Sequence, residues 1–180
     1  MIFTPTEIAG AMVVDMKQFA DDRGFFGRAF CAQEFEKHGL DPKVYQCNLS
    51  YNYKAGTLRG MHWQDETTPE PKFVRCIRGA IWDCLIDLRP GSETYGRYFG
   101  VELTAANRKG IYVPPLCAHG YQTLVDDSEA LYSVGGFYTP AAEHGIRFDD
   151  PAFNITWPHE VTVVSPKDRE WPLYTLEGGN

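Results

Sequence analysis

Hydrophobic and polar residues alternate along most of this chain in short runs that end at Gly, Pro, Asn or Asp. A period of two is typical of β-strands. The predicted strands cover residues 8–16, 44–50, 58–64, 73–78, 80–88, 98–103, 110–113, 120–124 and 129–134. A turn followed by an aromatic, strand-like run occupies residues 19–30. Only residues 32–38 predict an early helix, with Gly39 as its C-cap.

Many short strands with little helix predict an all-β sandwich or barrel. The period alone does not separate an immunoglobulin-like sandwich from a jelly roll. Residues 149–180 are punctuated by proline and are expected to wrap the outside of the sheets. The chain has 180 residues and contains neither repeats nor a linker, so we expect residues 1–180 to form one domain.

Charge and cysteine content limit the classes of function. The net charge is −7, which disfavours nucleic acid and anionic membranes as partners, since both bind basic surfaces. A phosphorylated small molecule remains compatible, because a few inward-facing arginines suffice to bind it. The five cysteines lack a C-x-x-C pair, and no apolar run approaches membrane-spanning length. These features indicate a cytoplasmic protein.

The stretch from Gly56 to Gln64 concentrates the candidate chemistry. Arg59 and His62 lie three residues apart, so strict alternation would point their side chains to opposite faces. Gly60 between them is a natural site for a bulge that turns both inward. With Lys72 at the start of the next strand, these residues suggest an anionic ligand beside a group that transfers protons.

A metal site is the first alternative. Metal-binding β-barrels often carry an H-x-H pair on one strand, but Gln64 stands two residues after His62 and is a poor ligand for zinc or iron. His119, which is expected in a tight turn that leads into a strand, has no histidine partner two residues away either. We therefore expect neither metal nor cofactor.

Each candidate also has a purely structural interpretation. His62 could be a hydrogen-bonded core histidine, and Lys72 could be a solvated strand end. Tyr132 and Tyr138 could be ordinary core tyrosines or general acids. Asp168 lies in a polar tail segment and, taken alone, is expected at the surface. Together the residues favour proton abstraction next to a carbonyl, without fixing the substrate.

Ordered motifs between about residues 20 and 172 make the sequence similar to the dTDP-4-dehydrorhamnose 3,5-epimerases, cupin-type jelly-roll enzymes of nucleotide-sugar metabolism. The motifs are Asp22-Arg23-Gly24-Phe25-Phe26, Gln46-x-Asn48, Leu58-Arg59-Gly60-Met61-His62-Trp63-Gln64, Lys72-Phe73-Val74-Arg75-Cys76, Trp82-Asp83 through Asp87-Leu88-Arg89, Gly91-Ser92-x-Thr94-Tyr95-Gly96, Ala118-His119-Gly120-Tyr121, Tyr138-x-Pro140, Asp149-Asp150-Pro151, Ile155-x-Trp157-Pro158 and Ser165-x-Lys167-Asp168.

The resemblance implies a jelly-roll barrel with a few short peripheral helices and a cofactor-independent epimerase. It would invert C3 and C5 of a nucleotide-linked 4-keto-6-deoxyhexose. His62 would be the base and Asp168 its partner, while Lys72 would stabilise the enolate and Tyr132 would protonate the opposite face.

The resemblance also implies a homodimer that binds a nucleotide-diphosphate sugar. Residues 23–26 would reach the neighbouring protomer's site, with Phe26 near the base. The implied substrate-binding residues are Arg23, Phe26, Arg28, Gln46, Asn48, Arg59, His119 and Tyr138.

Two departures from the family pattern leave alternatives open. Arg28 replaces a common glutamate that accepts a hydrogen bond from thymine, and arginine only donates. Ser133 follows Tyr132 where the family commonly has lysine. The alternatives are an epimerase acting at C3 or C5 only, one acting on a CDP- or GDP-linked sugar, a non-catalytic nucleotide-sugar-binding cupin and a metal-dependent cupin.

Overall fold

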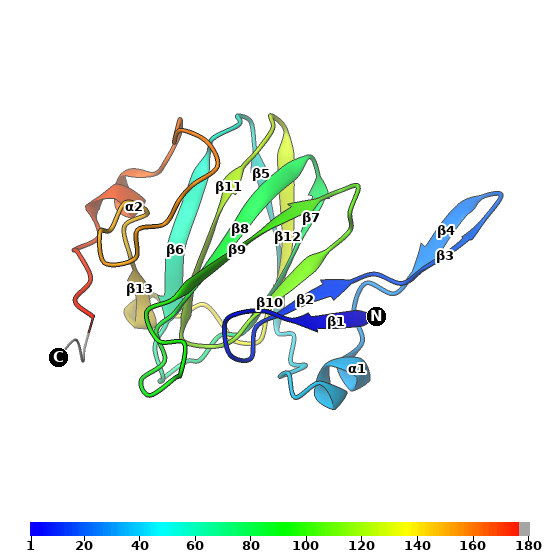
Figure 1. Ribbon diagram of the computed structural model, residues 1–180, viewed down its shortest axis with the longest axis horizontal. Coiled ribbons are helices and arrows are strands. Elements are labelled where there is room, and N and C mark those ends of the chain that lie inside the picture. Colours follow the sequence, from blue (N-terminus) through cyan, green and yellow to red (C-terminus); the bar gives the residue numbers. More distant parts are fainter. Residues whose placement is uncertain (177–180) are drawn as a thin grey trace.

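Two antiparallel sheets face one another in the computed structural model, which describes residues 1–176 (Figure 1). The larger sheet contains, in spatial order, β1 (Ile2–Pro5), β2 (Met12–Asp15), β10 (Gly110–Val113), β7 (Lys72–Arg78), β12 (Ser128–Val134) and β5 (Gln46–Asn52). The smaller contains β13 (Glu143–Gly145), β6 (Leu58–Gln64), β11 (Cys117–Thr123), β8 (Ala80–Asp87) and β9 (Tyr98–Thr104). The predicted all-β architecture is confirmed.

Short peripheral elements surround the sheets. They are the hairpin of β3 (Gln18–Asp21) and β4 (Gly24–Gly27), α1 (Ala32–Lys37), the 3-10 turn η1 (Pro140–Ala142) and α2 (Pro166–Glu170). Helix α1 ends where predicted, because Gly39 takes a φ of +72° just beyond it. The β3–β4 hairpin projects away from the two sheets (Figure 1).

The main core lies between the sheets. Val74, Ile111 and Ala130 of the larger sheet pack in one cluster with Ile81 and Leu85 of the smaller sheet, and all five side chains are fully buried. Alternation explains this arrangement, since every second residue of a strand points to the same face. The core thereby holds the two sheets together.

The outer face of the smaller sheet is covered by the tail, as the sequence predicted. Cys84 and Ile86 point outward from β8 and pack in one cluster with Phe153, Ile155 and Trp157. Strand β8 is therefore buried on both faces, which explains its almost continuous apolar sequence. The tail is brought in this way to the sheet that carries β6.

The prediction of a strand over residues 8–16 was wrong in its first half. Residues 7–10 form a turn in which the Thr6 hydroxyl accepts a hydrogen bond from the Ile8 amide, at 3.1 Å. Gly10, with a φ of +76°, ends the turn, and only Met12–Asp15 is extended. Strand β1 was not predicted. Ile8 nevertheless belongs to the core, which explains its apolar character without a strand.

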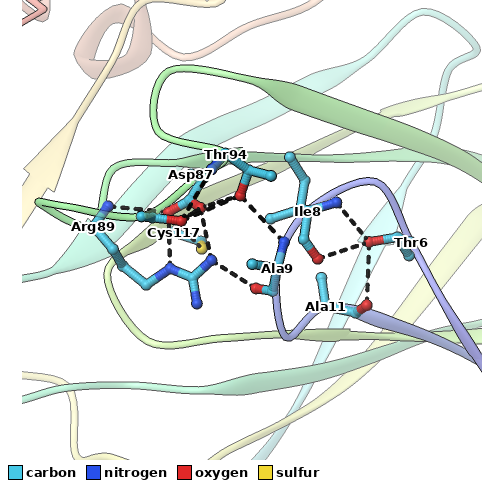
Figure 2. A network of polar contacts seen from close by, with 9 residues as sticks. Thr6, Ile8, Ala9, Ala11, Asp87, Arg89, Thr94 and Cys117 are labelled. Carbon is cyan, nitrogen blue, oxygen red and sulfur yellow. Dashed lines mark hydrogen bonds and ion pairs between the residues drawn. The ribbon is translucent and has the colours of Figure 1, made fainter.

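A polar network fastens this N-terminal turn to the loop after β8 (Figure 2). The buried Asp87 carboxylate accepts hydrogen bonds from Arg89 (2.7 Å), Ser92 (2.5 Å) and Thr94 (2.5 Å). Arg89 also donates to the Ala9 carbonyl at 2.6 Å, and the Ala9 amide donates to the Thr94 hydroxyl at 3.2 Å. One carboxylate thus organises two segments that are far apart in the sequence.

Replacing Asp87 by Asn is expected to lower the free energy of unfolding by about 2–4 kcal/mol at pH 7. Burial pushes the pKa of Asp87 upward, but the bonds from Arg89, Ser92 and Thr94 outweigh it and lower the pKa from 3.8 to about 2. A carboxyl whose pKa is lowered by folding stabilises the protein above its unfolded pKa. That stability is lost as the pH falls from about 5 to 2. Urea unfolding at pH 7 and pH 3 measures the change.

A matched control is the exposed pair of Asp149 and Arg147, which is also an aspartate and an arginine two residues apart. Asp149→Asn should cost at most about 1 kcal/mol, because exposed ion pairs contribute little. Equal losses in the Asp87 and Asp149 variants would contradict a special role for the buried carboxylate.

Candidate active site

A bulge at Gly60 turns two charged side chains toward the same cavity. Tyr121 of β11 pairs with Arg59, and His119 pairs with His62, so β6 carries one extra residue between the two pairs. Gly60 has a φ of +112°, a conformation that favours glycine, and the Gly60–Met61 peptide bond is cis. Arg59 and His62 both line the cavity, which confirms the predicted bulge.

Gly60 also lies against Gly120 of the neighbouring strand. A Cβ on Gly60 would stand 2.6 Å from the Gly120 Cα and 2.6 Å from the His119 carbonyl oxygen. A Cβ on Gly120 would stand 2.6 Å from the Arg59 carbonyl oxygen. Two glycines are thus required for the strands to approach here, and their contact sets the spacing of His62 and His119.

The cavity consists of two lobes that share His62, Lys72 and Tyr132. The tail lobe, of about 500 Å³, is named for the tail residues in its wall, and the β5 lobe, of about 390 Å³, for the strand that lines it. The tail lobe is lined by Ser50, Thr57, Leu58, Arg59, His62, Lys72, His119, Gly120, Tyr121, Tyr132, Val163, Val164, Ser165, Lys167 and Asp168. The β5 lobe is lined by Gln46, Asn48, His62, Trp63, Gln64, Glu70, Lys72, Tyr132, Val134, Tyr138 and Glu143.

His62 is paired with a buried carboxylate. Its Nε2 lies 2.6 Å from Oδ1 of Asp168, whose side chain is 6% exposed. Burial pushes the pKa of Asp168 upward, but hydrogen bonds from His62, Ser165 and Gly60 outweigh burial and leave that pKa below its usual value. Asp168 is therefore ionised at neutral pH. In a neutral imidazole, an ionised partner at Nε2 requires that nitrogen to carry the proton, which leaves Nδ1 as the acceptor.

The surface position expected for Asp168 was wrong. The residue lies in the first turn of α2, where its amide donates to the Ser165 hydroxyl at 3.1 Å. The Ser165 side chain thereby caps the helix. The tail pairs with Thr57 through Val163 and so carries α2 to β6. Sequence spacing could not predict this contact, because 106 residues separate Asp168 from His62.

Lys72 and Tyr132 come from the other sheet. Tyr132 pairs with Val74, two residues along β7 from Lys72, so both polar side chains project from one face of neighbouring strands. Lys72 is buried rather than solvated, and its Nζ lies 2.5 Å from Oε1 of Glu70. Sequence reasoning missed Glu70, although its position two residues before Lys72 was a signal.

The environment of Tyr132 keeps its phenol protonated. Burial, together with the nearby Tyr121 and Glu70, raises the pKa of Tyr132 above its usual value of 10. Arg59 acts in the opposite direction but does not reverse the shift. At neutral pH the hydroxyl is consequently available as a proton donor.

His119 forms a second histidine–carboxylate pair beside the first. It lies within β11 rather than in the predicted turn, and its Nε2 is 3.0 Å from each oxygen of Asp83. Asp83 is fully buried, and burial raises its pKa despite the opposing effect of His119. The pair anchors His119 in the wall of the tail lobe.

Arg59 supplies positive charge that no carboxylate neutralises directly. Its Nε donates to Oδ1 of Asn52 at 2.7 Å, and its Nη2 donates to the Tyr51 carbonyl at 3.3 Å. Within residues 1–176, no carboxylate lies within 4.0 Å of this guanidinium. A guanidinium held by neutral acceptors at the edge of a cavity is suited to bind an anion.

The β5 lobe contains the remaining candidates, Gln46 and Asn48 of the larger sheet and Tyr138 of the loop after β12. Gln46 and Asn48 point into it from β5, and the Tyr138 hydroxyl donates to Oε2 of Glu143 at 2.7 Å. Lys167, from the tail, lies 2.6 Å from the same Glu143 oxygen. Sequence reasoning missed Glu143 and Lys167, although Lys167 directly precedes Asp168.

Three predicted ligand contacts lie outside this cavity. Arg23 and Phe26 belong to the projecting hairpin; Arg23 pairs with Asp21 at 2.6 Å, and Phe26 is 71% exposed. Arg28 follows the hairpin and donates to Glu34 at 3.1 Å. None of the three lines either lobe of its own chain.

Within residues 1–176, no three His, Cys, Asp or Glu side chains gather as metal ligands would. Among the same residues, no helix has the length and apolar character needed to cross a membrane.

Comparisons with known proteins agree with this arrangement. Residues 5–175 match the model of the family described as dTDP-4-dehydrorhamnose 3,5-epimerase. The enzyme of that name from Methanothermobacter thermautotrophicus is 38% identical over 172 residues, which cover 94% of this chain and 92% of the relative.

Solved structures extend the likeness to the fold. The epimerase structure from Elizabethkingia anophelis has a TM-score of 0.94 at 32% identity and covers 97% of this chain and 96% of its own. The Bacillus anthracis enzyme, solved with TDP and pyrophosphate bound, has a TM-score of 0.92 at 34% identity, with coverage of 96% and 99%. These matches confirm the predicted cupin-type jelly roll, and the chain belongs to the dTDP-4-dehydrorhamnose 3,5-epimerase family.

Proposed function

We propose that this protein inverts C3 and C5 of a dTDP-linked 4-keto-6-deoxyhexose, with His62 as the base. The observation that carries the proposal is the position of the reactive groups on two walls. His62 and Asp168 lie on the side of the smaller sheet, while Lys72 and Tyr132 project from the larger sheet. Inversion requires removal of a proton from one face of a carbon and delivery to the other face, which two opposed walls allow.

The first step is proton abstraction. The C4 keto group acidifies the protons on C3 and C5, since the resulting carbanion is delocalised onto the carbonyl oxygen as an enolate. Nδ1 of His62 takes the proton, and Asp168 stabilises the imidazolium that forms. The Lys72 ammonium lies in the shared part of the cavity and stabilises the enolate oxygen.

The second step is reprotonation from the opposite wall. Tyr132 donates its phenolic proton to the carbanion carbon, the enolate collapses to the ketone, and the configuration is inverted. Solvent then restores the proton on the tyrosine and removes the one on His62. Repetition at the second carbon completes the 3,5-epimerisation, and no step requires a redox cofactor.

The nucleotide diphosphate is placed by charge. Arg59, without a carboxylate partner within ion-pair distance among residues 1–176, is the group we assign to the diphosphate. His119, Gln46, Asn48 and Tyr138 supply further polar contacts along the lobes. The Bacillus anthracis relative was solved with TDP and pyrophosphate. Its ligands support a thymidine nucleotide for this chain.

A homodimer is part of the proposal. The β3–β4 hairpin carries exposed Phe19, Phe25 and Phe26 on an arm that projects from the body (Figure 1). An exposed aromatic arm of this kind fits a second copy, whose site would receive Arg23, Phe26 and Arg28. Sedimentation equilibrium at micromolar concentration should give twice the chain mass.

The five cysteines, none in a disulfide, support a cytoplasmic location.

Deuterium incorporation tests the function directly. The protein is incubated in D₂O with dTDP-4-keto-6-deoxyglucose, and NMR follows the signals of the C3 and C5 protons. Wash-in at both carbons, with formation of the inverted product, is expected. Parallel reactions with the CDP- and GDP-linked sugars should be slower. Absence of exchange at both carbons of the dTDP sugar, beside an active control enzyme, would overturn the proposal.

A further inference from the structure

The segment from His159 to Asp168, here called the strap, crosses the edge of the smaller sheet and ends at His62. It pairs with the stretch that precedes the base: the Thr162 amide donates to the Gly56 carbonyl at 3.0 Å, and the Leu58 amide donates to the Val163 carbonyl at 2.8 Å. The base follows Leu58 by four residues along β6, and the carboxylate follows Val163 by five residues, in the first turn of α2. The register of the strap decides where Asp168 lies.

One buried side chain fixes the other end of the strap. Gln122 of β11 is fully buried, its Nε2 donates to the His159 carbonyl at 2.9 Å, and its Oε1 accepts from the His159 amide at 2.9 Å. A carboxamide that binds both backbone groups of one residue holds its position and its orientation. A movement of the strap that takes the His159 backbone away from Gln122 would break both bonds.

Just before the strap, Trp157 packs against Trp82 with ring centroids 5.2 Å apart, and Gln122 binds the backbone of the first strap residue. His159 and Glu160 are exposed, whereas Gly56 lies so close to the strap that a Cβ there would stand 2.6 Å from the Glu160 carbonyl oxygen. The strap therefore leaves no room for a side chain at position 56. Gln122 is a buried polar group that binds the first residue of the strap on its other side.

We propose that Gln122 is a positioning residue for the reaction, which acts through the strap to hold the Asp168 carboxylate on the His62 imidazole. Gln122 does not line the cavity and does not touch the substrate space. Its effect reaches Asp168 along the strap, through the hydrogen bond between the Leu58 amide and the Val163 carbonyl and then through the Ser165 cap of α2. The inference rests on the proposed role of His62 as the base.

Gln122→Met tests the inference, because methionine has a similar length but cannot bind the His159 backbone. We expect kcat for C3 and C5 exchange to fall by about 10- to 100-fold, the range caused by a misplacement of about 1 Å. KM should change by a smaller factor than kcat, since Arg59 and all residues that line the β5 lobe lie outside the strap. The low-field NMR signal of the proton between His62 and Asp168 should weaken, and this readout does not depend on turnover.

A double-mutant cycle separates positioning from general destabilisation. In an Asp168→Asn background, Gln122→Met should lower kcat by less than about twofold, because the contact it protects is already altered. Thr94→Val, a buried substitution in the Asp87 network, is the matched control; it should reduce stability, leave kcat unchanged and keep the NMR signal. If the methionine variant does not fold, Gln122→Glu, which keeps the acceptor for the His159 amide, takes its place.

Three outcomes would overturn the inference: an unchanged kcat, a loss of equal size in the Asp168→Asn background, or an unaltered proton signal. The failure of the proposed function would look different, since the wild-type protein would then show no exchange at all.

Discussion

Replacing His62 by Asn is expected to slow deuterium wash-in at both C3 and C5 by about 10³- to 10⁴-fold. A positioned general base contributes about 10² to 10⁴ to a rate, and here one base serves both carbons. Asparagine can still donate to Asp168, so the buried carboxylate keeps a partner and the fold should persist. The measurement is the NMR exchange assay, with circular dichroism to show that the variant is folded.

His144→Asn is the control for this variant. His144 is an exposed histidine that stacks on Trp63, with ring centroids 5.3 Å apart, and it lines neither lobe. Its replacement should leave both exchange rates unchanged. A His62 variant with a rate within tenfold of the wild type would show that another group removes the protons.

Replacing Tyr132 by Phe should separate exchange from inversion. We expect the yield of inverted sugar to fall by about 10²- to 10³-fold, because the phenolic proton on the larger sheet is lost. His62, whose side chain is 33% exposed, can still remove a proton and exchange it with solvent. Deuterium should therefore enter recovered, uninverted substrate. Mass spectrometry of the substrate and NMR of the product measure the two processes separately.

Tyr98→Phe provides the comparison, since Tyr98 packs on the outer face of the smaller sheet among the tail residues. It should alter neither quantity. If wash-in and inversion fall by the same factor in the Tyr132 variant, then Tyr132 positions the substrate and does not deliver the proton.

The local part of this site could be predicted from sequence, and the long-range part could not. Gly60 between Arg59 and His62 indicated a bulge because glycine tolerates the required φ, and the structure has that bulge. Gln64 disfavoured a metal-binding interpretation, and its buried amide instead donates to the Phe137 carbonyl at 3.1 Å. Such conclusions depend on residues that are neighbours in the chain.

Asp168 shows where such reasoning stops. A single aspartate among Lys167, Arg169 and Glu170 has the composition of a solvated helix surface, and only the path of the tail brings it to the base. The resemblance to a family assigned its role, whereas periodicity did not. Glu70 was missed for a related reason, because a buried ion pair two residues apart resembles an ordinary polar loop.

The hairpin residues pose a different problem. Arg23, Phe26 and Arg28 were predicted to contact substrate, and in one chain they point to solvent or to neighbouring acids. Neither the hydrophobic pattern of the sequence nor the fold of a single chain can place a residue in a site that two protomers form together. Their assignment as ligand contacts stays a prediction.

The contact of Gly60 with Gly120 has a consequence for how this enzyme can vary. Each added Cβ would meet backbone atoms of the opposite strand, and backbone, unlike a side chain, cannot be exchanged for something smaller. No compensating substitution elsewhere can therefore make room at either position. A substitution at either glycine is expected to change the spacing of both histidines and, with it, to impair the reaction.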